Sequence, residues 1–345
     1  MTRTGGAFLV ATLAMAPTAH SGVGQAGAQS LREPLAARPA ALGEAFAAVD
    51  GTTEALGYNP AGLATLAAPE GGALVRGGFA GDTFVSVLGG GPLMGFGVGA
   101  ALAYATDGTV ESRDPTGRTA QVNAQQDLVG MLGVGYRFAV LPVGAGAAIK
   151  VFHSQLIEEI GATDIAADLG VQAALPGGVG LGAAVQHLGG SLTYSAEDAA
   201  SDANVLPLLW RFGAAWELDL ARGAPALGMM DSTTAPARRE GDLERPATPV
   251  PHRLRVFAGA VARTAELVPE WGGGLEFSYA DRLSLRAGYR LLAGGGAARH
   301  EIWSLGLGAR LGRFRFDYAA ELLPFTLLHR ASVTVLGNRT EPGDS

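Results

Sequence analysis

The sequence predicts an all-β protein, a transmembrane outer-membrane antiparallel β-barrel of about 14 strands with an N-terminal short-helical plug in the lumen. Three observations predict this fold. The chain begins like an exported protein, yet it contains no apolar run long enough for a membrane helix. Segments of about ten residues alternate between apolar and polar side chains. The connections between these segments are short at one end of the expected barrel and longer at the other.

The composition excludes several classes of protein. Of the 345 residues, 17% are charged and 52 are glycine, whereas an average domain has about 25% charged residues and about 7% glycine. The net charge of −7 argues against nucleic acid as a partner. The chain has no cysteine, which excludes a disulfide scaffold, a thiolate zinc site, a cysteine nucleophile and a lipid-anchored cysteine.

Residues 1–28 have the features of a secretory signal peptide. Arg3 provides the positive charge, residues 7–16 are apolar, and Ala26-Gly27-Ala28 fits a cleavage site that would leave Gln29 as the first mature residue. No later stretch reaches about 18 consecutive apolar residues, so no helix is expected to span a bilayer. A closed barrel is the other structure that satisfies its backbone in lipid, so we expect export to the bacterial outer membrane.

The strands are predicted from alternation with a period of two. In residues 283–291 every odd position is apolar, while the even positions are Ser, Arg, Gly and Arg. On a strand this pattern gives one lipid face and one lumen face, whereas on a helix it would scatter charge on all sides. In the second segment, Phe84 and Leu88 disturb the alternation. The expected strands are 71–81, 82–90, 94–106, 124–138, 141–155, 163–175, 178–190, 205–219, 251–264, 272–280, 282–293, 300–312, 313–322 and 326–337.

The connections predict the orientation of the barrel. If the first strand runs outward, the short connections lie on the periplasmic side and the polar stretches 107–123 and 191–204 lie outside. An even number of strands then places both mature termini on the periplasmic side. The Pro-, Arg- and Ala-rich stretch 220–250 is the exception, and we expect it to be a disordered periplasmic loop.

Glycines and charged residues at the strand positions that face inward indicate what the lumen contains. Glycines alternate with apolar residues at 95, 97 and 99 and again at 144 and 146, which leaves room for something inside the barrel. The charged side chains on this face are interpreted as ion pairs that join the strands and bind the plug, and an alternative is that they line a polar path around the plug. Those singled out as lumen-facing are Arg211, Arg286, Arg290, Arg315, Asp317 and Arg330.

The segment before the first strand does not alternate. Residues 40–48 and 52–57 suit short helical turns, and Asn59-Pro60 signals a turn or a helix start. Positions 41–46 read Ala-Leu-Gly-Glu-Ala-Phe, Asp50 follows, and positions 58–63 read Tyr-Asn-Pro-Ala-Gly-Leu. In these motifs, and in others spread in order over residues 38–336, the chain resembles the PorV/PorQ family within the FadL-like outer-membrane barrels.

The resemblance implies a fourteen-stranded barrel whose N-terminal segment folds into the lumen as a plug, or hatch. The plug residues carried over from the motifs are Phe46, Asp50, Asn59, Pro60 and Ala61. FadL-like members pass hydrophobic molecules through the outer membrane, whereas PorV-like members carry substrates of the type IX secretion system. The chain departs from the family in its 220–250 insert and in its 338–345 tail, which follows the position where an aromatic signal for the barrel-assembly machinery is typical.

Other chemistry has weaker support in the sequence. The glycine-rich runs lie inside alternating segments rather than between a strand and a helix, which argues against nucleotide binding. The histidines are dispersed without metal-ligand spacing, so neither a metal nor a cofactor is expected. A membrane-embedded hydrolase needs a serine beside a histidine, but Ser332 and His329 have opposite parity and should lie on opposite faces of their strand.

The sequence therefore divides into a signal peptide (1–28), a plug (29–70), a barrel (71–337) and a tail (338–345). The first functional hypothesis is passive transport of small hydrophobic molecules across the outer membrane. The alternative is a type IX secretion component that binds exported proteins, and a barrel enzyme is a second alternative that we do not favour. Expected partners are outer-membrane lipid, a hydrophobic solute or an exported protein, and the barrel-assembly machinery.

Overall fold

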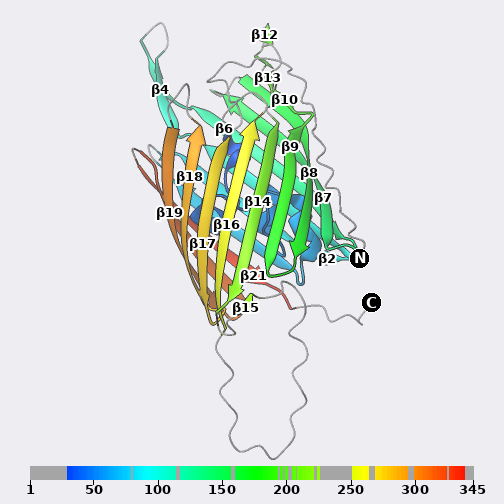
Figure 1. Cartoon of the computed structure of the whole chain (residues 1–345). Coiled ribbons are helices and arrows are strands. Elements are labelled where there is room, and N and C mark those ends of the chain that lie inside the picture. Colours follow the sequence, from blue (N-terminus) through cyan, green and yellow to red (C-terminus); the bar gives the residue numbers. More distant parts are fainter. Residues whose placement is uncertain are drawn as a thin grey trace, which may run out of the picture.

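Fourteen antiparallel strands close into a barrel in the computed structural model (Figure 1). The structure describes residues 29–78, 81–113, 117–156, 160–192, 195–196, 199–200, 204–206, 208–220, 224–225, 251–263, 269–293, 299–324 and 326–338. The barrel strands are β1 (Glu70–Gly77), β2 (Thr83–Leu93), β3 (Phe96–Thr106), β6 (Gln125–Arg137), β7 (Val143–Leu156), β8 (Ile160–Leu175), β9 (Val179–Leu188), β14 (Leu209–Asp219), β16 (His252–Arg263), β17 (Glu270–Tyr279), β18 (Leu283–Ala293), β19 (Arg299–Leu311), β20 (Phe314–Leu322) and β21 (Leu327–Leu336).

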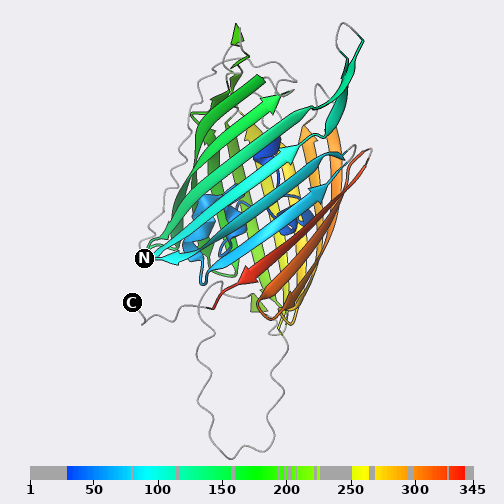
Figure 2. The same ribbon diagram turned by 180° about the vertical axis from the view of Figure 1, so that it is seen from behind.

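Each barrel strand pairs with the next one along the chain, and β21 pairs with β1 to close the barrel. Figure 2 shows β21, in red, beside the blue N-terminal strands. The predicted fold class is confirmed. The register is continuous from Thr83 to Leu93 between β2 and β3, so the wall is fully paired there. An irregularity lies between β8 and β9, at Ala167 and Leu169.

Alternation sorts the side chains as predicted. Leu285 and its register partner Leu307 are 58% and 57% exposed on the outer face, whereas Arg286, the next residue after Leu285, is buried in the lumen. Phe84 and Leu88 break the pattern because they also face the lumen, where they join the apolar core around the N-terminal segment. An apolar residue on the inner face therefore marks a contact with that segment.

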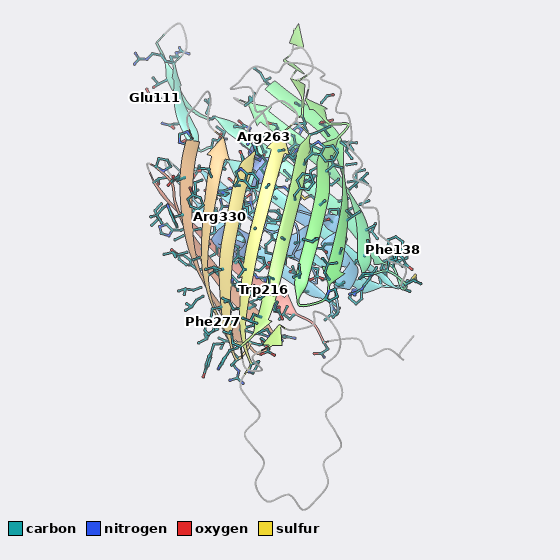
Figure 3. The ribbon with its side chains drawn as sticks, viewed as in Figure 1. Glu111, Phe138, Trp216, Arg263, Phe277 and Arg330 are labelled. Carbon is teal, nitrogen blue, oxygen red and sulfur yellow. The ribbon has the colours of Figure 1, made fainter. Side chains whose placement is uncertain are left out.

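The two ends of the barrel differ in their connections. One end, here called the long-connection end, carries the hairpin β4 (Thr109–Arg113) and β5 (Thr119–Asn123), whose Glu111 is labelled in Figure 3. It also carries β10 (Ser191–Leu192), β11 (Ser195–Ala196), β12 (Ala199–Ala200) and β13 (Asn204–Val205).

The opposite end, here called the short-turn end, has connections such as Met94-Gly95, which joins β2 to β3 with positive φ at both residues. Gly95 thus lies in a turn, and the prediction that it lines the lumen is wrong. β15 (Ala224–Pro225) also lies at this end. Most of the predicted 220–250 loop, the signal peptide and the end of the tail lie outside the described residues.

Residues 29–69 precede the barrel and lie inside it (Figures 1 and 2). They form η1 (Gln29–Arg32), α1 (Ala37–Ala41), η2 (Thr53–Gly57) and η3 (Pro60–Thr65). The helical turn predicted at 52–57 agrees with η2. The one predicted at 40–48 is wrong beyond Ala41, because Gly43 and Glu44 adopt positive φ and turn the chain. None of the helices among the described residues has the length and apolar character needed to cross a bilayer.

The N-terminal segment runs along the barrel axis rather than staying at one end. Ser30 donates a hydrogen bond to Asp127 near the start of β6, and Arg32 pairs with Glu270 at the start of β17, both at the long-connection end. The segment then runs toward the short-turn end, where β1 begins beside Leu336. The two ends of the described chain therefore lie at opposite ends of the barrel, which differs from the prediction that both mature termini lie on the periplasmic side.

Candidate functional site

The candidate site is the lumen together with residues 29–69, which we call the plug. The plug is buried along most of its length, and Ala37, Ala41, Leu42, Phe46 and Leu63 are fully buried. A segment this short cannot build a core of its own, so its apolar side chains are removed from water by the barrel wall. The lumen is therefore filled by the chain itself.

Glycines of the wall make room for the plug backbone. A Cβ atom on Gly97 would overlap the carbonyl oxygen of Leu63, and one on Gly182 would overlap the carbonyl oxygen of Ala47. The same holds for Gly146 against Pro60. Strand and plug backbones thus approach closely where the strand residue lacks a side chain, which explains the alternating glycines in the sequence.

Apolar contacts hold the plug from its start at the long-connection end to its middle. Leu31 and Leu35 belong to the same buried cluster as Phe84 and Phe152 of the wall. Leu35 also accepts a hydrogen bond of 2.8 Å from the Ser86 hydroxyl through its carbonyl oxygen. These contacts bury apolar surface at the long-connection end, where the plug begins.

Phe46 lies at the centre of a second buried cluster. Its ring lies 5.3 Å from the ring of Tyr58, and the Arg38 guanidinium lies over it at 5.4 Å from the ring centroid. Both distances are typical of favourable aromatic and cation–π contacts. Phe46 therefore packs two parts of the plug together.

An ion-pair network joins the middle of the plug to β17, β18 and β20. Arg38 donates two hydrogen bonds, of 2.8 and 2.9 Å, to Glu276. Arg286 bridges Glu276 and Asp317 at 2.6 Å each. Arg315 in turn bridges Asp317, at 2.9 Å, and Glu54 of the plug. Burial by itself lowers the pKa of the Arg38 guanidinium, but Glu276 and Glu54 outweigh it, so its pKa is raised and it stays charged.

A second network joins the plug to the wall nearer the long-connection end. Arg330, labelled in Figure 3, donates to Glu33 of the plug at 2.7 Å and to Glu321 at 2.5 Å. Arg290 donates to Glu321 at 3.1 Å and to Glu44 of the plug. Burial raises the pKa of Glu33, but the charges of Arg330 and Arg76 outweigh it and hold that pKa below its usual value.

Arg211 belongs to a third group, on β7, β8, β9 and β14. Its guanidinium lies 5.1 Å from the ring of Tyr58 and donates to Gln186 at 2.5 Å. Gln186 donates both to the Gly57 carbonyl oxygen of the plug and to Asp168, which pairs with Lys150 at 2.7 Å. The wall thus contacts η2 through a chain of hydrogen-bonded and ion-paired side chains.

The Asn59 side chain makes three hydrogen bonds that hold the part of the plug nearer the short-turn end. Its Oδ1 accepts from the N–H of Ala61 at 3.1 Å and caps η3, where Pro60 occupies the first position. Its Nδ2 donates to the carbonyl oxygens of Ala47 in the plug and Val171 in β8, at 2.7 and 3.0 Å. One buried side chain therefore joins two plug segments to the wall.

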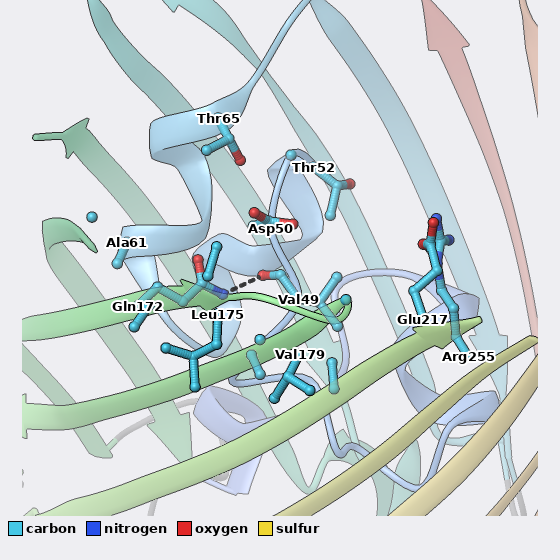
Figure 4. Close-up of a pocket in the computed structure, with 18 of the residues that line it drawn as sticks. Val49, Asp50, Thr52, Ala61, Thr65, Gln172, Leu175, Val179, Glu217 and Arg255 are labelled. Carbon is cyan, nitrogen blue, oxygen red and sulfur yellow. Dashed lines mark hydrogen bonds and ion pairs between the residues drawn. The ribbon is translucent and has the colours of Figure 1, made fainter. Parts of the chain in front are cut away.

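Asp50 faces a cavity of about 480 Å³ at the short-turn end (Figure 4). The cavity lies between the plug and β6 to β9, β14 and β16, and Gln172 on its wall donates a hydrogen bond of 3.0 Å to the Val49 carbonyl oxygen. Burial raises the pKa of Asp50. Arg255, on the far side of the cavity, pairs with Glu217 and with Glu276.

The structure thus places all eleven sequence-predicted residues at the plug or the lumen wall, and the six charged ones in three separate groups. The sequence analysis missed the plug carboxylates of Glu33, Glu44 and Glu54 as their partners. Their signal was present, because acidic side chains in a largely apolar segment require cations nearby.

Two arrangements considered in the sequence, a metal site and a Ser332–His329 pair, can be compared with the described residues. No group of three or more histidine or acidic residues is arranged there to hold a metal ion. The Ser332 hydroxyl accepts a hydrogen bond from the Ala37 N–H in the lumen, while His329 contacts Tyr318 on the outer face. Ser332 and His329 thus lie on opposite faces of β21.

Comparisons with known proteins identify the fold. A scan of protein-family models and a search of curated proteins each found no match. Among solved structures, the toluene transporter TodX of Pseudomonas putida aligns with 13% identity and a TM-score of 0.55, over 90% of this chain and all of its own. A CymD monoaromatic hydrocarbon channel aligns with 10% identity and a TM-score of 0.52, over 89% and 97% of the two chains.

A FadL homologue of Pseudomonas aeruginosa aligns with 9% identity and a TM-score of 0.52, over 87% of this chain and 96% of its own. At these identities the similarity concerns the fold. The closed fourteen-strand barrel therefore shares its fold with these outer-membrane channel structures.

Proposed function

We propose that this protein is a bacterial outer-membrane channel for the passive entry of small hydrophobic molecules, with monoaromatic hydrocarbons as the first class to test. One observation carries the proposal: the lumen of a FadL-like barrel is filled by the plug, so the protein is not an open water-filled pore. The solved neighbours TodX and CymD are named for toluene and monoaromatic hydrocarbons. We further propose that residues 1–28 direct export and that the long-connection end faces outward.

Passage in this proposal requires the plug to shift without leaving a buried arginine of the wall unpaired. Arg290 and Arg315 each contact a carboxylate of the plug and a second one on the wall, Glu321 and Asp317 respectively. If Glu44 or Glu54 moves away, the arginine retains its wall partner, so a shift does not leave an unpaired buried cation. The cavity beside Asp50 already provides space at the short-turn end.

Uptake by cells tests the proposal. A host with an intact lipopolysaccharide layer and no hydrocarbon channel of its own is given radiolabelled toluene, and initial uptake is compared with and without this protein. We expect faster uptake with the protein and no change for a charged solute of similar size. Equal toluene uptake in both cultures would contradict the proposal.

A PorV/PorQ-type role in type IX secretion is the second candidate, and the motifs at 41–46 and 58–63 favour it. Mild detergent extraction from the native host distinguishes the two. Secretion components or exported proteins that co-purify with the barrel would support the secretion role, whereas a bound apolar molecule would support transport. We propose no enzymatic activity, and assembly by the barrel-assembly machinery follows from the outer-membrane location.

A further inference from the structure

Two neighbouring turns at the short-turn end expose a mainly apolar surface, and Arg137 is the charged residue within its range. The β2–β3 turn presents Met94 and the β6–β7 turn presents Val140, each 92% exposed. Large apolar side chains surround them, and we call the whole set the rim patch. It consists of Leu93, Met94, Phe96, Tyr136, Phe138, Val140 and Leu141.

The rim patch continues the lipid-facing surface of the barrel without a break. Phe96 pairs with Tyr136 across β3 and β6, and their rings lie 5.1 Å apart. The ring of Phe138 lies 5.4 Å from that of Tyr136, one step nearer the turn. Behind Tyr136 on the same face of β6, Val134 and Leu132 are exposed to lipid. Aromatic rings at this level are typical of the membrane–water interface.

Two turns on the other side of the same rim have the opposite character. The β17–β18 turn exposes Asp281 and Arg282, and the β19–β20 turn exposes Arg313 with Arg310 beside it. Asp281 pairs with Arg253 at 3.0 Å. Figure 3 shows Phe138 on one side of the lower barrel and Phe277, next to the charged β17–β18 turn, on the other. Charged turns belong in water, so the β17–β18 and β19–β20 turns are expected to be hydrated.

We infer that the rim patch lies within the membrane leaflet at the short-turn end, so the barrel sits deeper in lipid at β2–β3 and β6–β7 than at β17–β20. The occupant of the patch is lipid, because the patch extends a surface that lipid already covers. Its backbone suits this location. The first turn has two residues, and the second is closed by a hydrogen bond of 3.0 Å from the Phe138 N–H to the Val143 carbonyl oxygen.

This placement gives the cavity a lipid neighbour. Arg137, Pro142 and Val143 flank the rim patch and also line the cavity beside Asp50. One edge of the cavity therefore lies beside the rim patch, while Glu217, Arg253 and Arg255 line its other side. The insertion itself does not depend on transport and can be tested without a solute.

Site-specific fluorescence tests the inference, since the chain has no native cysteine. Single cysteines replace Met94 or Val140 in the rim patch and, as matched controls, Arg282 or Arg313 at the same end. Each variant carries an environment-sensitive nitrobenzoxadiazole label and is reconstituted in phosphatidylcholine vesicles. Heat-modifiable migration on gels confirms that each barrel is folded. One sample contains lipid with a nitroxide quencher on its acyl chain, and the other contains iodide on both sides.

At positions 94 and 140 we expect blue-shifted emission that loses most of its intensity to the nitroxide lipid and little to iodide. At positions 282 and 313 we expect the reverse. Iodide quenching at all four positions would overturn the inference, because the rim patch would then lie in water. Shielding of 94 and 140 from both quenchers would also overturn it, because a protein, such as a second copy of this chain, would then cover the patch.

Discussion

Replacing Asn59 by alanine should release the half of the plug nearer the short-turn end from the barrel wall. The change removes the cap of η3, which costs about 1 kcal/mol. It also removes the hydrogen bonds to Ala47 and Val171, at about 1 kcal/mol each. The total of about 3 kcal/mol corresponds to a roughly 100-fold rise in the ratio of displaced to docked plug, since about 1.4 kcal/mol is a factor of ten.

Ion conductance across planar bilayers measures this ratio, because a displaced plug leaves a water-filled lumen. The wild type should remain closed for nearly all of the recording, and Asn59→Ala should open far more often. Asn59→Ser is the matched control. It keeps a capping oxygen and loses the two donors, so its open time should fall between those of the other two. An alanine variant that is folded and as closed as the wild type would refute this account of how the plug is held.

Three further outcomes are expected. Gly97→Ala should destabilise the docked plug by about 1–3 kcal/mol because its Cβ would overlap the Leu63 carbonyl oxygen, whereas Gly130→Ala, with open space around its Cβ, should leave the urea midpoint unchanged. Leu305→Arg places a charge in lipid at the middle of β19 and should cost about 2–4 kcal/mol in a urea titration in liposomes, well above the cost of Leu305→Ala; equal costs would mean that residue 305 does not face lipid. Glu33→Gln should weaken plug docking most above pH 4.5. Because the pKa of Glu33 is lowered in the folded protein, the difference in conductance between the variant and the wild type should shrink as the pH falls below 4.5. A difference that does not vary with pH would contradict the Arg330 contact.

Periodicity predicted the barrel because lipid and lumen impose opposite demands on successive residues. Arg286 lies in the lumen and Leu285 in lipid for that reason alone, and no knowledge of the plug is needed. The alternating glycines predicted free space in the lumen, and the structure shows that the plug backbone fills it. The family motifs at 41–46 and 58–63 supplied what periodicity could not, namely the expectation that a segment without alternation lies inside.

The features that sequence analysis missed depend on tertiary contacts. Phe84 and Leu88 disrupt the alternation, because the inner face is apolar where it meets Leu31 and Leu35. The turn after Ala41 requires positive φ at Glu44, for which local propensity offers no signal. The position of Ser30 at the long-connection end depends on the path of the whole plug, so counting strands could not predict it.

A reversible cross-link between plug and wall tests most directly whether the plug must move for a solute to pass. A Cβ built on Gly144 of β7 lies 3.4 Å from the Cβ of Ala64 in η3, close to the separation of about 3.5–4.5 Å that a disulfide needs. The double variant Ala64→Cys, Gly144→Cys carries no competing thiol, and each single variant is its control.

The measurement is toluene uptake by cells that carry the double variant, before and after reduction. Our account predicts that the oxidised protein supports no more uptake than cells without the barrel. Reduction should restore uptake to the level of the single variants. Equal uptake in the oxidised and reduced states would contradict the claim that the plug gates the channel.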